Sequence, residues 1–244
     1  MPWSTTSSEW GMAPGFSKVQ PTTADSILFR QNDYPQSVAF VASGWIKTVR
    51  LERDGEGRGV ALYTKGSLLG LAELISGQKY PDTTITLSPS SLLWITNQEF
   101  FDFIRTDLRF VLQINQALSR QNYACGICLA QSGALPPRQR LEQLIWQLLQ
   151  AQSRDGATPY GSRAERKLLA PVQNRDLARM LGVTAESFSR TLKMMETEGV
   201  LQRRKGRMIF PDPERLWRAP EIESLVESNC GQNSQLTLAD PIYA

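Results

Sequence analysis

The spacing of the apolar residues changes near residue 96, and this change limits what the chain can fold into. Between Ile27 and Ile95 the apolar residues form short runs separated by turn signals, such as the Gly-containing stretch 54–57. Short runs rich in Val, Ile, Trp and Thr are typical of an antiparallel β-sandwich or barrel. From Asn97 to Ser132 the apolar residues instead follow a helical period. We therefore expect a β-domain followed by a long helix.

The helical stretch also carries a heptad pattern. Its first and fourth positions are mostly apolar or small, and one glutamine interrupts them: Val111, Ile114, Leu118, Gln121, Cys125 and Cys128. A long amphipathic helix usually needs a partner, so we expect a homodimer through this seam. Packing of the helix against its own domain is the alternative. Pro136-Pro137 ends the helix, because proline lacks the amide donor and disfavours helical geometry in the preceding residue. A second amphipathic helix follows at once.

The segment from Val172 to Phe210 has the pattern of a helix-turn-helix followed by a β-hairpin. Leu177 and Leu181 share one helical face, Gly182 allows a tight turn, and Thr184 is placed to cap a second helix. A connection of this length is the one that helix-turn-helix motifs use. The buried face expected for the second helix consists of Phe188, Leu192 and Met195.

The opposite face of the second helix carries a polar stripe that could read DNA. Its residues fall at i, i+3, i+4 and i+7: Glu186, Ser189, Arg190 and Lys193. Arginine matches guanine O6 and N7, and glutamate accepts from cytosine N4, when such a helix lies in the major groove. The next residues read as a strand, a basic turn and a strand, that is, a wing. We expect its cations to contact phosphates: Arg203, Arg204, Lys205 and Arg207. Thr184, at the start of the second helix, is also expected to contact DNA. A solvent-facing polar helix beside a basic hairpin is the alternative.

Charge and histidine content narrow the function. Residues 170–218 hold ten Lys and Arg against six Asp and Glu, whereas the whole chain has a net charge of only +3. A local basic excess is what a nucleic-acid-binding module produces. The chain contains no histidine, which excludes Ser-His-Asp catalysis, histidine-ligated haem and the histidine metal centres of cupin-like enzymes. We expect a DNA-binding protein and not an enzyme.

Nothing in the sequence indicates secretion or a membrane. Three cysteines in 244 residues cannot form a disulfide scaffold, and no early basic-then-apolar segment resembles a signal peptide. No apolar run approaches the roughly 18 residues of a membrane span. A cytoplasmic protein is expected.

In the order of these features the chain resembles the Crp/Fnr superfamily of bacterial transcription regulators, over about residues 25–217. The segments SGWIKTVRL and KGSLLGLAELISG stand at matching places in the β-domain, and the string Glu186-Ser187-Phe188-Ser189-Arg190 resembles the E-x-x-S-R recognition helix of the Fnr-like branch. The resemblance implies a homodimer on a palindromic site with TTGAT-like half-sites, base readout by Glu186, Ser189 and Arg190, and RNA polymerase as a further partner.

The resemblance also implies the architecture. An α+β chain is expected, with an N-terminal jelly-roll β-barrel like that of cyclic-nucleotide-binding proteins, a dimerisation helix and a C-terminal winged helix-turn-helix. The expected boundaries are a flexible arm (1–20), the effector-sensing β-roll (21–107), the dimerisation helix (108–135), the DNA-binding domain (136–217) and a tail (218–244).

The effector region departs from the pattern of cyclic-nucleotide-binding members. These hold the ribose with a glutamate directly after a glycine and the phosphate with an Arg-Ser/Thr pair, whereas here Leu71 follows Gly70 and Glu73 comes two places late. The following segment offers Lys79 but no arginine. A cyclic phosphate would lose its bidentate partner, so cyclic AMP is not expected to bind.

Cys125 and Cys128 leave a second sensor open. Both fall on the heptad seam, so a parallel dimer would gather four thiols, which could hold an iron–sulfur cluster or a metal, or close an intersubunit disulfide. The alternative is that cysteine serves there as a small apolar residue in a tight seam. A regulator controlled by a non-nucleotide organic effector, or by its abundance alone, is the competing interpretation.

Overall fold

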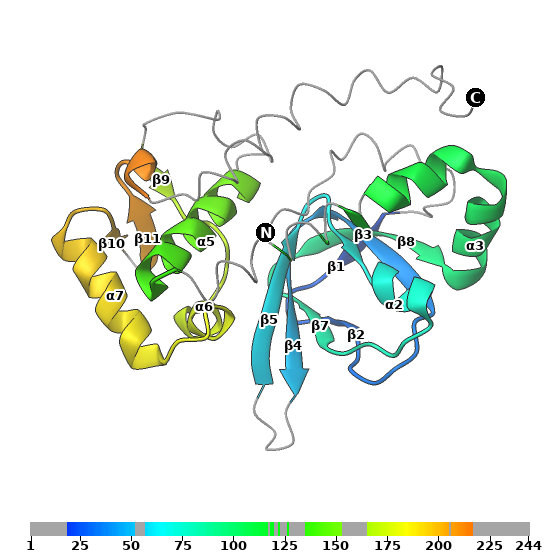
Figure 1. Ribbon diagram of the computed structural model, residues 1–244, viewed down its shortest axis with the longest axis horizontal. Helices are drawn as coiled ribbons and strands as arrows, with labels where there is room; N and C mark the ends of the chain where they lie inside the picture. The colour runs from blue at the N-terminus through cyan, green and yellow to red at the C-terminus, as the bar shows by residue number, and fades with distance from the viewer. Residues whose placement is uncertain are drawn as a thin grey trace.

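The computed structural model describes residues 19–51, 57–116, 118–119, 122, 126, 135–152, 165–204 and 206–216. Its N-terminal half contains two four-stranded antiparallel sheets (Figure 1). One has the order β1 (Gln20–Thr22), β8 (Ser90–Thr96), β3 (Ser37–Ser43), β6 (Leu68–Leu69). The other has the order β2 (Ile27–Phe29), β7 (Thr83–Thr86), β4 (Trp45–Leu51), β5 (Gly57–Thr64).

The two sheets pack face to face around an apolar interior. Val41 and Leu92 from the first sheet meet Phe29 and Ile46 from the second in one buried cluster. β4 and β5 form an antiparallel hairpin that pairs down to Leu51 opposite Gly57, while residues 54–56 of the turn expected between them lie outside the described residues. The expected β-roll is therefore confirmed.

Helices cover the outer face of the first sheet. They are α2 (Leu71–Ser76), α3 (Asn97–Thr106) and the helical residues 108–116. Thr96 caps α3 in a capping box with Glu99, in which each side chain bonds the other residue's backbone N–H. The hydroxyl and backbone N–H of Thr96 hold the pKa of Glu99 below its usual value.

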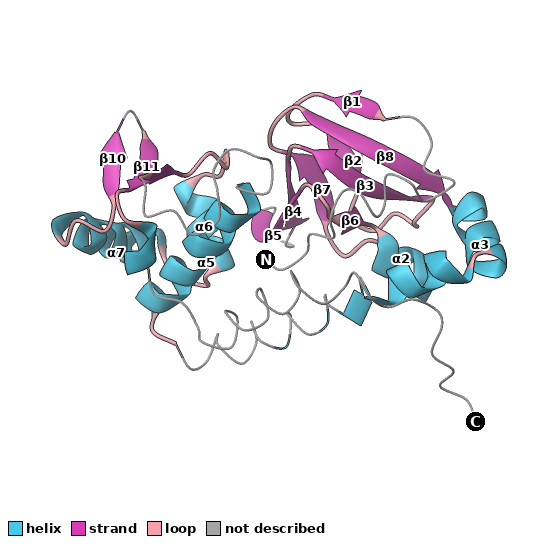
Figure 2. Ribbon diagram, turned by 90° about the horizontal axis from the view of Figure 1, so that it is seen from above, coloured by secondary structure: helices cyan, strands magenta, loops and turns pink. Residues whose placement is uncertain are grey.

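The C-terminal half is a small helical module with a three-stranded sheet of order β10, β11, β9 (Figure 2). Its elements are α5 (Pro137–Gln152), β9 (Arg166–Lys167), α6 (Asn174–Met180), α7 (Ala185–Thr197), β10 (Gln202–Arg204), β11 (Arg207–Phe210) and the 3-10 turn η2 (Pro213–Arg215). As expected, a new helix begins directly at the Pro136-Pro137 pair. The α+β class and the winged helix-turn-helix are thus confirmed.

The two halves share part of one core. Trp45 of β4 and Leu62 of β5 belong to the same buried cluster as Leu177 of α6, and β5 lies beside α6 in both ribbon views (Figures 1 and 2). Lys47 Nζ donates to Asp176 Oδ2 across this contact at 3.0 Å. The β4–β5 hairpin is therefore the part of the β-roll that contacts the C-terminal module. Across the described ranges, no helix has the length and apolar character needed to cross a membrane.

Candidate nucleic-acid interface

The turn between α6 and α7 is built as the sequence predicts. Gly182 adopts a φ of 65°, a backbone conformation that side chains disfavour. Thr184 then caps α7, since its hydroxyl accepts from the backbone N–H of Ser187 at 3.1 Å. The cap satisfies one of the helix's free N–H groups and fixes where the recognition helix begins.

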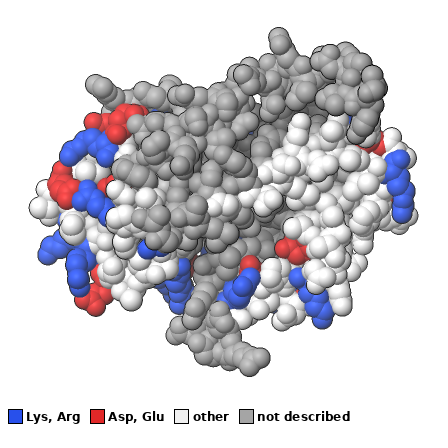
Figure 3. Space-filling model, in the orientation of Figure 1, with Lys and Arg blue, Asp and Glu red and all other residues white. Residues whose placement is uncertain are grey.

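One face of α7 is buried and the other is open to solvent. Phe188, Leu192 and Met195 pack into the core of the module. On the opposite side the four residues of the predicted polar stripe are exposed: Glu186, Ser189, Arg190 and Lys193. α7 runs along the outer edge of the molecule, away from the β-roll (Figure 1). Basic and acidic side chains alternate over this part of the surface (Figure 3).

Glu186 and Arg190 are already paired on the open face. Arg190 Nη2 donates to Glu186 Oε1 at 2.9 Å, and their side chains are 72% and 83% exposed, Arg190 first. An exposed i,i+4 pair of this kind adds little stability. It does hold the guanidinium over the face while Arg190's other N–H donors stay available, because arginine has five of them.

The wing forms as expected, but its cations are used differently. Arg203 makes two hydrogen bonds to Glu196 of α7, Nε to Oε1 at 2.5 Å and Nη2 to Oε2 at 2.6 Å. These bonds hold the pKa of Glu196 below its usual value. Arg203 therefore fastens the wing to α7, and its contact with phosphate stays a prediction. Arg204 and Arg207 are exposed, and Lys205 lies outside the described residues.

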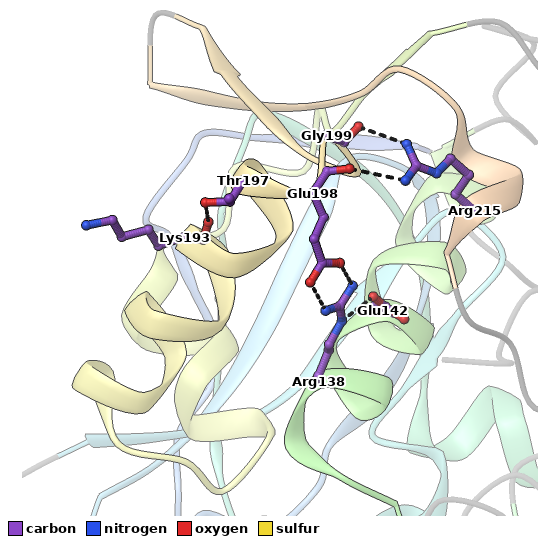
Figure 4. Close-up of polar contacts among 7 residues, drawn as sticks. All are labelled: Arg138, Glu142, Lys193, Thr197, Glu198, Gly199 and Arg215. Carbon is purple, nitrogen blue, oxygen red and sulfur yellow. Dashed lines mark hydrogen bonds and ion pairs between the residues drawn. The ribbon is translucent and has the colours of Figure 1, made fainter.

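A second arginine–carboxylate pair lies at the end of α7 and was missed by the sequence reasoning (Figure 4). Arg138, in the first turn of α5, donates from Nη1 to Glu198 Oε1 at 2.6 Å and from Nη2 to Glu198 Oε2. Its Nε donates to Glu142 Oε1 at 2.9 Å. Sixty residues separate Arg138 from Glu198, and no periodicity in the sequence links positions so far apart.

The dimerisation seam and the cysteine pair are only partly described. Ile114 is 5% exposed in a cluster with Phe100 and Phe110, and Leu118 packs on the same cluster. The helix thus turns these residues towards its own β-roll, as the alternative interpretation allowed, while Val111 is half-buried. Three further seam residues lie outside the described part of the chain: Gln121, Cys125 and Cys128.

Charged side chains in the region of the expected effector pocket pair with protein groups. Asp82 accepts from Arg50 Nε at 2.7 Å, and Lys79 Nζ lies 4.9 Å from the centre of the Tyr34 ring. The Thr83 hydroxyl accepts from the backbone N–H of Gln31 at 3.1 Å. Within the described ranges no group of three or more Cys, Asp or Glu is placed to hold a metal ion.

Comparison with known proteins gives two family matches in the order in which the domains occur. Residues 20–107 match the cyclic nucleotide-binding domain family, and residues 139–219 match the Crp-like helix-turn-helix domain family. The chain belongs to the Crp/Fnr superfamily. As a member, it is a DNA-binding transcription regulator and not an enzyme, as the absence of histidine led us to expect.

Individual relatives agree with this assignment. The cyclic AMP receptor protein of Thermus thermophilus is 24% identical over 175 residues, which cover 72% of this chain and 75% of that protein. The structure of FixK2 from Bradyrhizobium japonicum superposes with a TM-score of 0.68 at 16% identity, over 83% of this chain and 98% of that one. A transcriptional regulator of the CRP family, also from Thermus thermophilus, gives a TM-score of 0.63 at 16% identity, over 81% and 94%. At these identities the two structures show a shared fold.

Proposed function

We propose that this Crp/Fnr regulator binds, as a homodimer, a two-fold symmetric site with TTGAT-like half-sites. The observation that carries the proposal is the open face of α7, where Glu186, Ser189 and Arg190 are exposed on a helix whose opposite face is buried. Arg190 donates to guanine and Glu186 accepts from cytosine in the major groove. Ser189 lies between them and adds a small hydroxyl donor and acceptor.

Phosphate contacts set orientation and salt dependence. The wing supplies them through Arg203, Arg204, Lys205 and Arg207, of which Arg203 is also bonded to Glu196. Lys193 extends the polar stripe towards the C-terminal end of α7, which is the end that leads into the wing. Because each phosphate contact releases counterions, binding weakens steeply as salt rises.

A second copy of the chain fits the long helix. Leu108 and Leu112 are 66% and 42% exposed there, one helical turn apart. An apolar pair left open on a helix is a place for a partner to pack. With one recognition helix from each copy, the dimer spans two half-sites about one helical turn apart. RNA polymerase is the further partner that a regulator of this superfamily implies.

A gel-shift titration tests the proposal at a fixed, stated salt concentration. One duplex carries TTGAT-N4-ATCAA and the other the same bases in scrambled order. We expect affinity for the first to exceed that for the second by at least about a thousandfold. Equal affinity for the two duplexes would contradict sequence-specific readout.

The input signal is not cyclic AMP. Arg50 is paired with Asp82, and the segment that follows α2 supplies a carboxylate and no arginine to a cyclic phosphate. Titration with cyclic AMP should leave the thermal unfolding midpoint unchanged. A rise in the midpoint would contradict this.

Two kinds of control remain for this regulator. One is sensing through the thiols of Cys125 and Cys128, and the other is control by a non-nucleotide organic effector or by the abundance of the protein alone. Protein purified without oxygen separates them. The thiol sensor is supported if the wild-type protein contains iron or zinc and a Cys125→Ser/Cys128→Ser variant loses both the metal and DNA binding. Metal-free protein with unchanged DNA binding in that variant excludes it.

A further inference from the structure

The C-terminal end of the recognition helix is held by side chains from two other elements (Figure 4). Glu198, the C-cap of α7, accepts hydrogen bonds from both terminal nitrogens of Arg138 of α5. Arg215 of η2 donates to the backbone carbonyls of Glu198 at 3.1 Å and of Gly199 at 3.4 Å. The end of α7 is therefore held through the carboxylate of Glu198 and through the backbone carbonyls of Glu198 and Gly199.

The position of Glu198 requires a cation. A carboxylate at the C-terminus of a helix faces the negative end of the helix dipole, which disfavours it. Hydrogen bonds from Arg138 hold the pKa of Glu198 below its usual value, so the carboxylate stays charged there. The same bonds to Glu198, with those to Glu142, raise the pKa of Arg138 above its already high value.

Arg138 itself has little freedom to move. Its Nε is bonded to Glu142, whose side chain is only 6% exposed, and its two terminal nitrogens are bonded to Glu198. A planar guanidinium fixed on three nitrogens sets an angle between its partners, which the single point charge of a lysine cannot do. The fork thus orients α7 against the first turn of α5.

That first turn is where the chain enters the DNA-binding module, immediately after Pro136-Pro137. From the same turn, Arg140 Nη1 donates to the carbonyl of Leu181 at 2.9 Å, in the turn that precedes α7. One helical turn of α5 therefore contacts both the C-terminal end of α7 and the turn that leads into α7. The direction of α7 relative to the incoming chain follows from these two contacts.

We propose that Arg138 is a positioning residue for DNA recognition. Through Glu198 it sets the direction of α7 with respect to the turn that joins the module to the dimerisation helix, and hence the separation of half-sites that a dimer reads. The inference rests on the function proposed above. It assigns to Arg138 and Glu198 a role in selecting half-site spacing, while base identity belongs to the open face of α7.

The test compares duplexes that differ in spacing alone. The series contains TTGAT-N4-ATCAA, duplexes whose spacer is about one base pair shorter or longer, and a duplex with a single half-site. Glu198→Ala is the primary variant, because it leaves the Arg138–Glu142 pair and both Arg215 bonds in place. Arg138→Ala tests the same contact from the other side, and the double variant closes the cycle. Arg105→Gln, which breaks an exposed pair with Asp102 on α3, is the matched control.

Loss of positioning should affect the two-site duplex selectively. We expect Glu198→Ala to bind the single half-site within about twofold of wild type and the N4 duplex about tenfold more weakly, because both modules must fit at once. Its preference among the three spacers should flatten, and the double variant should be no weaker than Arg138→Ala alone. The control should match wild type throughout.

Two results would overturn the inference: unchanged spacer preference in Glu198→Ala, or an equal loss on the half-site and on every spacer, which is what a merely loosened module would give. Failure of the proposed function is distinguishable, since wild type would then not prefer any of these duplexes over the scrambled one.

Discussion

Individual side chains at the two ends of α7 have separate tasks. Residues near its start point outwards and suit base readout, while Glu196 and Glu198 near its end are bonded to Arg203 and Arg138. The outward set could be predicted from i, i+3, i+4 spacing together with the apolar positions of the same helix. The two arginine–carboxylate pairs near its end could not, because each joins residues on different elements and carries no periodic signal. The pair of Arg203 with Glu196 shows the limit, since the sequence of a basic turn gives its charge but not which carboxylate lies beside it.

The lowered pKa of Glu198 makes this pair sensitive to acid. A carboxylate whose pKa is lower in the folded than in the unfolded state stabilises the fold at pH values above its pKa in the unfolded state, which is 4.5. That contribution is lost as the pH falls through the lowered pKa. Thermal midpoints measured from pH 7 down to about pH 3 should therefore show a gap between wild type and Glu198→Gln that narrows below about pH 4.5.

A gap that narrows over the same pH range should appear for Arg138→Gln, and it should be larger at pH 7, because this change removes the bond to Glu142 as well. A difference in thermal midpoint that stayed constant down to about pH 3 would show that the charge of Glu198 does not stabilise the fold.

At the scale of elements, the change in apolar spacing was enough to predict the order of the fold. Apart from β1, the strands of the two four-stranded sheets lie in the segment of short apolar runs, α5 begins at Pro137, and Gly182 and Thr184 stand at the turn and the cap. The partner of the long helix was harder to predict. The heptad pattern predicts that Ile114 is buried. It does not distinguish burial against Phe110 of the same chain from burial against a second copy.

The cap of α7 carries a prediction of its own. Thr184→Ala removes the acceptor for the Ser187 N–H, so the free energy of unfolding should fall by about 0.5–2 kcal/mol in chemical denaturation. Thr184→Ser keeps the acceptor and should stay close to wild type. An alanine variant as stable as the serine variant would mean that the hydroxyl does not cap the helix.

At the scale of the whole molecule, the β-roll and the DNA-binding module are joined through the β4–β5 hairpin. Trp45 and Leu62 complete a core that otherwise belongs to the module, and Lys47 is paired with Asp176, whose side chain is 6% exposed. A buried carboxylate that loses its partner keeps the cost of leaving water. Sequence reasoning placed both domains but had no means to find this contact, which joins residues 129 positions apart.

Lys47→Met tests the contact while keeping an apolar stem of similar length. The free energy of unfolding should fall by about 1–3 kcal/mol, because Asp176 is left buried without its cation. Lys47→Met/Asp176→Leu should recover most of the loss, since an apolar pair needs no charge compensation. A Lys47→Met variant as stable as wild type would show that the pair does not hold the two domains together.

The most direct test of the central claim is a base-by-base scan of one half-site at fixed salt, with wild type and Arg190→Ala compared by fluorescence anisotropy. Wild type should lose about 1–3 kcal/mol of binding free energy at each base pair that α7 reads. Arg190→Ala should bind the parent site more weakly and become indifferent to one base pair while keeping the other preferences. If wild type binds every duplex of the scan equally well, or if Arg190→Ala weakens all of them by the same factor, α7 does not read sequence in the way its open face indicates.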